Sequence, residues 1–547
     1  MKQNGKKYNF NNSTVELERL KDMQGYDWMW AAEQKDGVTI SAECDYPEQG
    51  KKQKGVGLKM LTVKNLNAVV FSNNEAGSRT CFLHQNIATL GKSSTKPNLF
   101  IFDNSHELYE AHAETLKSEG YKVYLLDFKD EVASDKWNPL SALVWRVKLI
   151  RELENELENR DGKYYALDEV FTTYKQVRER ATELRQSLYE NVYEITESLY
   201  GGTTTENVDT SKKLISAFIL AMCEDCIASK LCTSQLLLTN VYQNLLKYGV
   251  EGDDVLKGYL MKMRNRYSKA KVLMNEIFAL QGGESFKKAV GGAIFLFSHA
   301  FDDKIGLITS EPLIDLYCED EHQTAIFIVG DKTGCYQHRY IELFFTQAYK
   351  ARMELEQMQS RRMDYEIPAF RRSSYFLIND YKSSLSVPFG KGIFTTDDMR
   401  RKLILVSQSY SQLLEKYGSG FEDWIKSSGV LKMFLSADDV ESKKEYCELC
   451  CNREGTESKP EQKRVEMEIF DNAKGVGNAV VAVGDNPPAS TRFTPAYKLF
   501  GLYCPEGEVK QVEKQRNTLD KSALFDIGRL EQTDDSLGEK KEVSPMK

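Results

Sequence analysis

An eight-residue turn, residues 73–80, comes nearest in this sequence to a phosphate-binding loop. Such loops follow the pattern GxxxxGK[ST]: glycines let backbone N–H groups converge on the phosphates, the lysine reaches the outer phosphates and the hydroxyl holds Mg²⁺. Here Thr80 keeps the hydroxyl and Arg79 keeps a positive charge. With Gly77 and Ser78 they are the candidates for binding nucleotide phosphates, and Thr80 is a candidate for binding Mg²⁺.

The same turn departs from the pattern in ways that weaken phosphate binding. Asn73 and Ser78 replace the two anchor glycines, and Ser78 adds a Cβ where the backbone must approach a phosphate closely. Arginine spreads its charge over a bulky planar fork, so Arg79 is not equivalent to the lysine. Glu75 adds a negative charge. By pattern alone an ordinary turn between a strand and a helix is favoured, so the interpretation depends on the surrounding elements.

Cysteines and histidines offer weaker candidates. Cys223 and Cys226 lie in an apolar helical stretch with Cys232 nearby, and buried packing is favoured over metal binding because no second ligand pair follows. Cys447, Cys450 and Cys451 form a tighter cluster, with Cys504 further on, for which a thiolate metal site is the minority interpretation. The six histidines show no HExxH spacing, and no serine lies in a GxSxG elbow.

Strand and helix patterns surround the phosphate-loop candidate. Apolar β-branched residues 66–71 predict a strand, and residues 81–90 predict a helix after the turn. Residues 98–102 and 121–127 predict two more strands, joined by an amphipathic helix over residues 106–119. Strand, helix and strand in this order predict a parallel sheet with helices on both faces.

A long helical block interrupts the sheet. From residue 140 to about 280, apolar residues recur at three- and four-residue spacing between many charges. Strand patterns return at residues 325–329, 375–378, 403–406 and 431–435. We therefore expect an N-terminal segment (1–60), a first sheet part (61–140), an all-helical domain (141–285), a second sheet part (286–450) and a C-terminal extension (451–547). The charge-rich end from about residue 511 predicts poor order.

Composition narrows the class of protein. Of 547 residues, 73 Lys and Arg against 81 Asp and Glu give a net charge of −8, so any nucleic-acid contact must come from local patches. The 11 cysteines lack the density of a secreted scaffold. No apolar stretch approaches the roughly 20 residues needed to cross a bilayer. We expect a cytoplasmic, multidomain protein without a transmembrane segment.

Residues 98–140 contain a strand ending in Asp103, a Glu-Leu helix start, GYKV and a closing WNPL. In this order they resemble the type IV secretion coupling proteins, the TraG/TraD-like conjugation ATPases. TAIFIVGDKTG (324–334) is similar to the family's next strand and turn, and LILVSQSYSQLLEKYG (403–418) to its glutamine motif. The resemblance covers roughly residues 61–450 and includes a helical insertion where the family has one.

The resemblance implies a RecA-like P-loop NTPase sheet interrupted by an all-helical domain. It implies an ATPase that binds ATP and Mg²⁺, assembles as a ring at the inner face of the cell membrane, and passes a DNA–relaxase complex to a secretion channel. In such a ring, Arg361, Arg362, Arg371 and Arg372 could contact DNA phosphates. A solvated helix face balanced by nearby acids is an equally supported alternative for these arginines.

The family's second ATPase motif is also altered. It is an apolar strand ending in Asp-Glu, in which Asp positions Mg²⁺ and Glu polarises the attacking water. Here the strand ends in Asn379-Asp380, so the metal-side residue is neutral and the catalytic carboxylate is one methylene shorter. At such a site, misplacement by ~1 Å can cost about a hundredfold in rate. Gln408 keeps the glutamine motif, at a strand end where it can sense the outer phosphate.

Three functional hypotheses follow from these residues. The first is a coupling-protein-like subunit of a type IV secretion system that serves DNA transfer, with a weakened or inactive ATP site that binds ATP and Mg²⁺ weakly or not at all. The second is a non-catalytic adaptor or regulatory partner of an active coupling ATPase, which recruits cargo through its helical domain. The third is an active motor in which Arg79 and Asp380 suffice. Each predicts a homo- or hetero-oligomeric ring and membrane association through partners.

Overall fold

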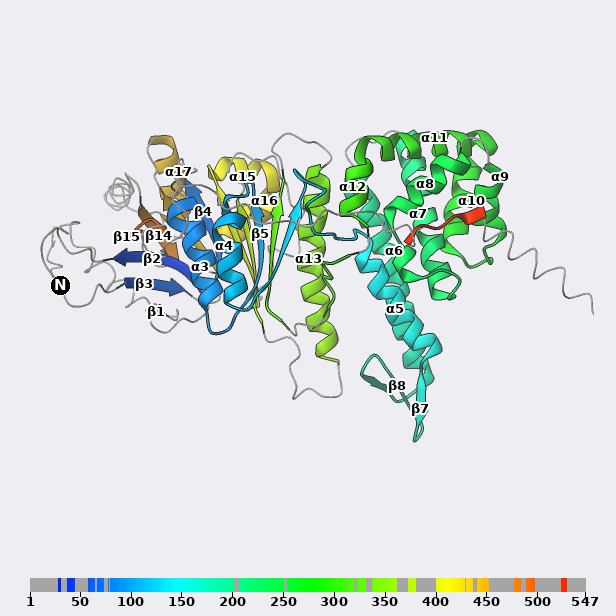
Figure 1. The fold of residues 1–547 in the computed structure, drawn as a ribbon, viewed down its shortest axis with the longest axis horizontal. Helices are drawn as coiled ribbons and strands as arrows, with labels where there is room; N and C mark the ends of the chain where they lie inside the picture. Colours follow the sequence, from blue (N-terminus) through cyan, green and yellow to red (C-terminus); the bar gives the residue numbers. More distant parts are fainter. Residues whose placement is uncertain are drawn as a thin grey trace, which may run out of the picture. The chain divides into compact units, whose positions relative to one another are not determined.

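The computed structural model describes the chain in segments and divides it into two compact units (Figure 1). The first unit comprises residues 1–125, 320–332 and 371–513, and the second comprises residues 126–319, 333–370 and 514–547. The described residues are 28–30, 37–44, 58–63, 66–72, 77, 79–200, 206–249, 253–310, 312–318, 322–330, 337–361, 372–379, 400–427, 429–435, 440–451, 477–483, 488–496 and 523–528.

The first unit is built on a nine-stranded sheet with the order β15-β14-β13-β4-β12-β11-β5-β10-β6. The pairs from β13 through β10 are parallel, whereas β14 and β15 add antiparallel strands at one edge. The strands are β4 (Asn67–Ser72), β5 (Asn98–Asp103), β6 (Lys122–Asp127), β10 (Thr324–Val329), β11 (Ser374–Asn379), β12 (Arg401–Ser407), β13 (Val430–Leu435), β14 (Asn478–Val483) and β15 (Ala489–Arg492).

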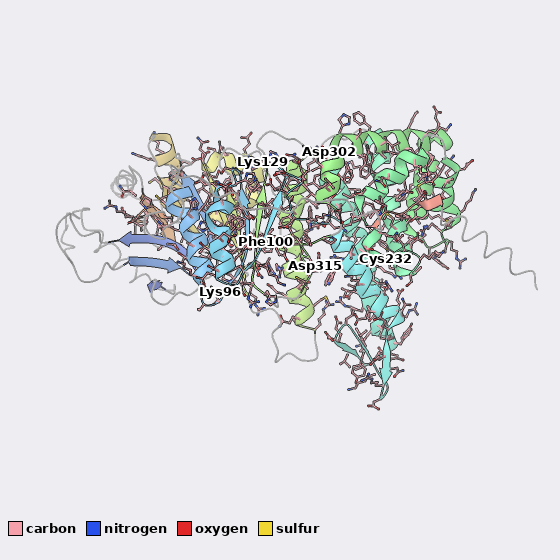
Figure 2. All side chains as sticks on the ribbon, in the orientation of Figure 1. Lys96, Phe100, Lys129, Cys232, Asp302 and Asp315 are labelled. Atoms are coloured by element: carbon pink, nitrogen blue, oxygen red, sulfur yellow. The ribbon has the colours of Figure 1, made fainter. Side chains whose placement is uncertain are left out.

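The central strands are buried along their whole length, which explains their continuous apolar sequences. Every residue of β5, β11, β12 and β13 is buried, as expected for a parallel sheet covered on both faces. Phe100 of β5, labelled in Figure 2, lies in this core. Its ring stacks on Phe376 of β11 with ring centroids 4.6 Å apart. The seven strands predicted from the sequence are confirmed, and so is the α/β class with a sheet interrupted by helices.

Helices cover the two faces of this sheet. On one face, α3 (His84–Lys92) and α4 (Glu107–Ser118) contribute Ile87, Leu90, Leu108 and Leu116 to the core. Elsewhere Phe71 of β4 stacks on Tyr446 of α17 (Val440–Cys451), with centroids 5.3 Å apart. Two shorter helices, α15 (Tyr410–Tyr417) and α16 (Ser419–Lys426), follow β12. These contacts fix the strand ends relative to the helices that begin beside them.

A small antiparallel sheet that the sequence patterns did not predict accompanies the first unit. It consists of β1 (Trp28–Trp30), β2 (Val38–Cys44) and β3 (Leu58–Val63). Thr39 of β2 donates its backbone N–H to Asn86 Oδ1 of α3 at 2.8 Å, and Thr491 of β15 donates its hydroxyl to Ile40 O at 2.8 Å. These two hydrogen bonds attach β2 to a sheet edge and to α3.

The second unit is mainly helical. Its helices are α5 (Ser141–Asn155), α6 (Tyr174–Tyr200), α7 (Glu206–Ile227), α8 (Leu238–Gly249), α9 (Asp253–Lys257), α10 (Lys269–Gln281), α11 (Gly283–Ala300), α12 (Asp303–Ile308) and α13 (Gln337–Gln359). Helix α7 contacts α5, α6, α10 and α11. Its residues 214–223 are all buried, and a helix that is apolar on all sides belongs in a core.

Three short strands also lie in the second unit. They are β7 (Glu158–Arg160), β8 (Lys163–Ala166) and β9 (Glu169–Phe171), which form an antiparallel sheet between α5 and α6. Asp161 and Gly162 at the β7–β8 turn both have positive φ angles, 52° and 73°, which suits a tight hairpin. The sequence pattern predicted only helices here, because these strands are too short to show alternation.

Candidate nucleotide site at the carboxyl edge of the sheet

The four strands that carry the predicted site residues are neighbours in the sheet. β12 pairs in parallel with β4 on one side and with β11 on the other, and β11 pairs with β5. Because parallel strands end at the same edge, this order brings together Asp103, Asn379, Gln408 and Ser72, the last residue of β4. Crevices at the carboxyl ends of such strands are where α/β proteins bind ligands.

The phosphate-loop candidate is described in part. Gly77 is helical and buried, and Ser78 lies outside the described residues, as does the stretch 73–76. Arg79 and Thr80 are the first two residues of a π-helical turn, Arg79–Leu83, that leads directly into α3. The predicted strand before this segment and the predicted helix after it are thus both present. π-helical turns are rare and often mark functional sites.

Asn379 ends β11 at the place where the resemblance expects a metal-binding carboxylate. The residue is only 1% exposed, and its side-chain Oδ1 has no hydrogen-bond partner among the described residues. Its backbone oxygen accepts a hydrogen bond from Asn104 Nδ2 at 3.4 Å. Asp380, the candidate catalytic carboxylate, lies outside the described residues. A buried carboxamide oxygen without a partner is costly unless a ligand or water satisfies it.

Asp103 ends the neighbouring strand β5, but both of its carboxylate oxygens are already engaged. Oδ1 accepts the backbone N–H of Ser105 at 3.1 Å, and Oδ2 accepts that of Tyr109 at 3.0 Å. Burial raises the pKa of Asp103, and the two backbone hydrogen bonds oppose that rise. The residue therefore holds the turn that begins α4, in which His106 adopts a left-handed conformation with φ 67°.

The described residues at this edge are a poor fit for a tightly bound Mg²⁺. The ion prefers charged carboxylates together with water and phosphate oxygens. In the described part of this edge, Asn379 supplies a neutral oxygen and Asp103 caps a helix. Gln408 directly follows β12 and is half-buried, and its backbone oxygen accepts a hydrogen bond from the Tyr446 hydroxyl at 3.5 Å.

A buried pair of histidines beside this edge was missed by the sequence analysis. His84 of α3 places Nδ1 2.9 Å from His112 Nε2 of α4, and its Nε2 lies 3.2 Å from Glu107 Oε1. Burial lowers the pKa of His112 well below its usual value, and the neighbouring His84 lowers it further. The residues lie 23 and 28 positions apart on two helices, so sequence spacing gave no sign of the pair.

This pair predicts a pH-dependent stability. Because the folded pKa of His112 is depressed, the unfolded chain binds the proton more strongly. The free energy of unfolding should fall as pH drops through the unfolded histidine pKa of about 6.5, with a slope of at most about 1.4 kcal/mol per pH unit. Urea unfolding at several pH values measures the effect. His112→Gln should flatten this slope, whereas the exposed His299 offers a matched control, His299→Gln, that should not. An unchanged slope in His112→Gln would contradict the assignment.

The predicted DNA-contacting arginines are placed only in part. Arg361 is exposed and its guanidinium lies 3.6 Å from Glu183, and Arg372 is half-buried. Arg362 and Arg371 lie outside the described residues. Among neighbouring cations, Lys350 pairs with Glu194 at 2.8 Å. Three others are buried: Arg352, Arg401 and Lys402. The DNA contact of the four arginines stays a prediction.

The cysteine candidates are placed as follows. Cys223 and Cys226 are buried on α7, and burial raises the pKa of both thiols, that of Cys226 to about 12. Cys447 is buried on α17, and Cys504 lies outside the described residues. Within the segments that the structure describes, no group of three or more His, Cys, Asp or Glu side chains could hold a metal ion.

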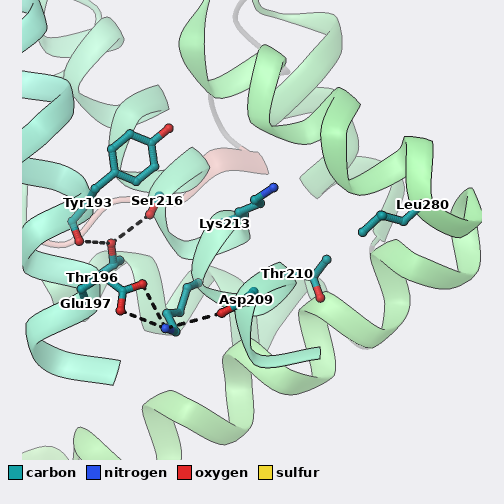
Figure 3. A pocket seen from close by; sticks show the side chains of 9 residues that line it. Tyr193, Thr196, Glu197, Asp209, Thr210, Lys213, Ser216 and Leu280 are labelled. Carbon is teal, nitrogen blue, oxygen red and sulfur yellow. Dashed lines mark hydrogen bonds and ion pairs between the residues drawn. The ribbon is translucent and has the colours of Figure 1, made fainter. Parts of the chain in front are cut away.

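A cavity lined by charged, hydroxyl and apolar side chains lies within the helical unit, between α6, α7 and α10 (Figure 3). It encloses about 640 Å³. Lys212 is nearly buried there, and its ammonium group lies 2.9 Å from Glu197 Oε1 and 3.6 Å from Asp209 Oδ1. Thr196 and Ser216 share a hydroxyl hydrogen bond of 3.0 Å. The charges that line this cavity are therefore largely neutralised within the unit.

One part of the chain matches a known family. Residues 90–172 match the family model described as Type IV secretory system Conjugative DNA transfer. The matched span runs from α3 through β5, α4 and β6 to β9 and contains the GYKV and WNPL segments. The predicted resemblance to type IV secretion coupling proteins is confirmed over this span.

Three solved structures illustrate what this chain is similar to. The unbound monoclinic form of the bacterial conjugative coupling protein TrwBΔN70 is 12% identical, covers 79% of this chain and 85% of its own, and has a TM-score of 0.46. TrwB in complex with ADP and Mg²⁺ is 13% identical over 83% and 88%, with a TM-score of 0.44. VirB4 of Thermoanaerobacter pseudethanolicus is 13% identical over 84% and 96%, with a TM-score of 0.41. None of the curated proteins matches the chain.

Among the helices that the structure describes, none combines the length and the apolar character that crossing a membrane requires.

Proposed function

We propose that this chain is a subunit of a type IV secretion or conjugation system that serves DNA transfer and whose ATP site is weakened. The observation that carries the proposal is Asn379, a buried neutral residue at the end of β11 whose Oδ1 has no partner among the described residues. Phosphoryl transfer depends on fixed charges that hold Mg²⁺ and the phosphates. A carboxamide supplies none of that charge.

The phosphate loop supports the same conclusion independently. Ser78 and Asn73 replace glycines, and Arg79 replaces the lysine, so the loop has lost both its small residues and its compact point charge. One altered residue is compatible with an active enzyme. Changes in the segment after β4 and at the end of β11 affect both the phosphate side and the metal side of one site, so we expect ATP and Mg²⁺ to bind weakly or not at all.

The second candidate function is a non-catalytic adaptor or regulatory partner of an active coupling ATPase. The helical unit favours it, because α8 already holds a short segment of this chain through a dense set of hydrogen bonds. In this interpretation the helical unit recruits cargo such as a DNA–relaxase complex. Assembly into a homo- or hetero-oligomeric ring and attachment to the membrane face through partners belong to both proposals.

Equilibrium titration with Mg-ATP tests the weakened site. Wild-type protein should not saturate at millimolar ATP, and Asn379→Asp should tighten Mg²⁺-dependent binding at least about tenfold, or ~1.4 kcal/mol, because it restores a carboxylate of nearly the same shape. Arg79→Ala and Thr80→Ala should remove the binding gained. Asn104→Asp, which places the same charge just after β5, is the matched control and should gain nothing. Tight wild-type binding with ATP turnover would contradict the proposal.

DNA binding tests the role in transfer. Replacement of the four arginines by glutamine should weaken binding and flatten its salt dependence, because each phosphate contact contributes about 0.9 to the slope of log K against log salt. The residues are Arg361, Arg362, Arg371 and Arg372. Lys350→Gln serves as a control, since Lys350 already pairs with Glu194. Unchanged DNA binding of the quadruple variant at low salt would contradict the contact.

A further inference from the structure

A six-residue segment near the end of the sequence, residues 523–528, lies on α8 in the helical unit (Figure 1, red). Two asparagines one helical turn apart hold it by its backbone. Asn240 Nδ2 donates to Ala523 O at 2.9 Å, and Asn240 Oδ1 accepts the N–H of Phe525 at 3.2 Å. Asn244 repeats the arrangement two residues on, donating to Phe525 O at 3.0 Å and accepting from Ile527 N at 3.0 Å.

This pair of carboxamides acts like the edge of a strand. The contacted backbone groups recur every second residue, the spacing at which a neighbouring strand would contact them. Both asparagines are buried, and each Nδ2 also donates to a carbonyl of its own unit, Gln235 O at 2.6 Å and Asn240 O at 2.8 Å. These hydrogen bonds orient the Asn240 and Asn244 carboxamides even when no segment is bound.

Side chains of the segment add sequence selectivity. Ile527 is fully buried. The Asp526 carboxylate pairs with Lys247 and accepts a hydrogen bond from the Tyr248 hydroxyl. Gly528 has no room for a side chain, because a Cβ there would overlap the Tyr248 hydroxyl. The α8 surface thus selects an acidic residue, a branched aliphatic residue and glycine in consecutive positions.

Charge contributes to the contact at neutral pH. Burial acts to raise the pKa of Asp526, but the hydrogen bonds from Lys247 and Tyr248 more than offset it, so the pKa is lowered. The Asp526 hydrogen bond also raises the pKa of Lys247. The contact is therefore complete when Asp526 is ionised and weakens as pH falls through its lowered pKa.

The contact with α8 involves only six residues, 523–528, whereas the stretch of chain that precedes them is long. Residues 497–522, which number 26, separate Ala496 from Ala523. At about 3.3–3.6 Å per residue, such a stretch can span up to roughly 90 Å. The occupancy of a six-residue contact depends on the effective concentration that its connection to the same chain provides, and this concentration falls as the connecting stretch lengthens. A site that recognises a short local sequence on a long tether favours exchange of that segment between copies.

We propose that α8 carries a peptide-binding site, formed by Asn240, Asn244, Lys247 and Tyr248, for a segment of the type Phe-Asp-Ile-Gly. In this chain residues 523–528 fill the site, and the same segment of a second copy is the partner that takes their place. The site links helical units through exchange of their terminal segments and is independent of the nucleotide site.

A fluorescent peptide of residues 520–531 tests the site on the full chain. The chain's own segment is released by Asp526→Lys with Ile527→Asp, and circular dichroism checks its fold. The released chain should bind the peptide with an apparent Kd at least tenfold lower than the wild-type chain, because the tethered segment no longer competes. A peptide carrying the same two substitutions should not bind, and adding Asn240→Ala and Asn244→Ala to the released chain should abolish binding. Absence of saturable binding, or equal binding of the substituted peptide, would overturn the proposal.

Exchange between copies is tested separately by cross-linking. One tagged copy carries Lys247→Cys and another carries Asp526→Cys, so mild oxidation should give a disulfide-linked pair of differently tagged chains. As a control, the Lys247→Cys copy is mixed with a tagged copy that retains Asp526. Any linked pair in this mixture comes from the native cysteines and sets the background. If the linked pair does not exceed that background, the second copy is not the partner and the exchange is refuted.

Discussion

Arg264→Met is expected to lower the free energy of unfolding of the helical unit by about 3–5 kcal/mol, because it leaves a buried carboxylate without its partner. The Arg264 guanidinium makes a two-pronged contact with Asp225, both N–O distances being 2.6 Å, and Asp225 also accepts from the Tyr259 hydroxyl at 2.9 Å. Arg264 further donates to Tyr259 O and Ala221 O. This network joins the end of α7 to the turn before α10.

Urea unfolding followed by circular dichroism measures the loss, and hydrogen exchange of α7 assigns it to the helical unit. The double variant Arg264→Met with Asp225→Leu should recover most of the stability, since no charge then remains buried. Lys213→Met is the matched control: its partner Glu276 lies at 2.8 Å but both side chains are over two-fifths exposed, so the loss should stay below about 1 kcal/mol. If Arg264→Met and Lys213→Met lowered the free energy of unfolding equally, burial of the ion pair would not explain the loss.

Trp137→Ala is expected to cost about 3–5 kcal/mol for a different reason, the cavity left by a large buried ring. Trp137 is fully buried and its ring packs edge-on against Phe344 of α13, with centroids 5.1 Å apart. Its backbone N–H donates to Ile308 O at 2.8 Å. The next residues of the WNPL segment continue the connection, since Asn138 donates to Leu236 O and Pro139 O accepts from Gln347.

Trp137→Phe separates ring packing from hydrogen bonding. The indole Nε1 has no hydrogen-bond partner among the described residues, so phenylalanine loses part of the ring but no hydrogen bond. We expect its cost to be less than half that of alanine. Unfolding midpoints in urea compare the two variants. If phenylalanine proved as destabilising as alanine, a polar contact of Nε1 rather than cavity formation would have to explain the loss.

The parallel core of the sheet was predictable because its sequences are continuous and apolar. Residues 98–102 and 375–378 are short, continuous apolar runs. Such runs between polar turns are typical of buried parallel strands. The structure extends each by only one or two residues. Asn379 and Gln408 could likewise be placed at strand ends, since the strands that precede them were clear.

The features that sequence patterns did not predict depend on distant pairing. β14 and β15 lie beyond the predicted sheet and pair antiparallel with β13 and with each other. The contact between His84 and His112 requires α3 and α4 to lie side by side, and Asn240 meets Phe525 across 285 positions of sequence. In each case the local sequence contains no motif or spacing that predicts the contact, and only the three-dimensional arrangement brings the groups together.

The strand order also determines when the sheet can form during protein synthesis. β4, β5 and β6 are made first, yet no two of them are neighbours: β4 lies between β13 and β12, β5 between β11 and β10, and β6 beside β10. Between Asp103 and Thr324 the ribosome must add 324 − 103 = 221 residues before β5 meets β10. At roughly 5–20 residues per second this takes about 11–44 s. During that time β4, β5 and β6 have no partner strand in this sheet, so the nascent chain is expected to need a chaperone until β10, β11 and β12 have been made.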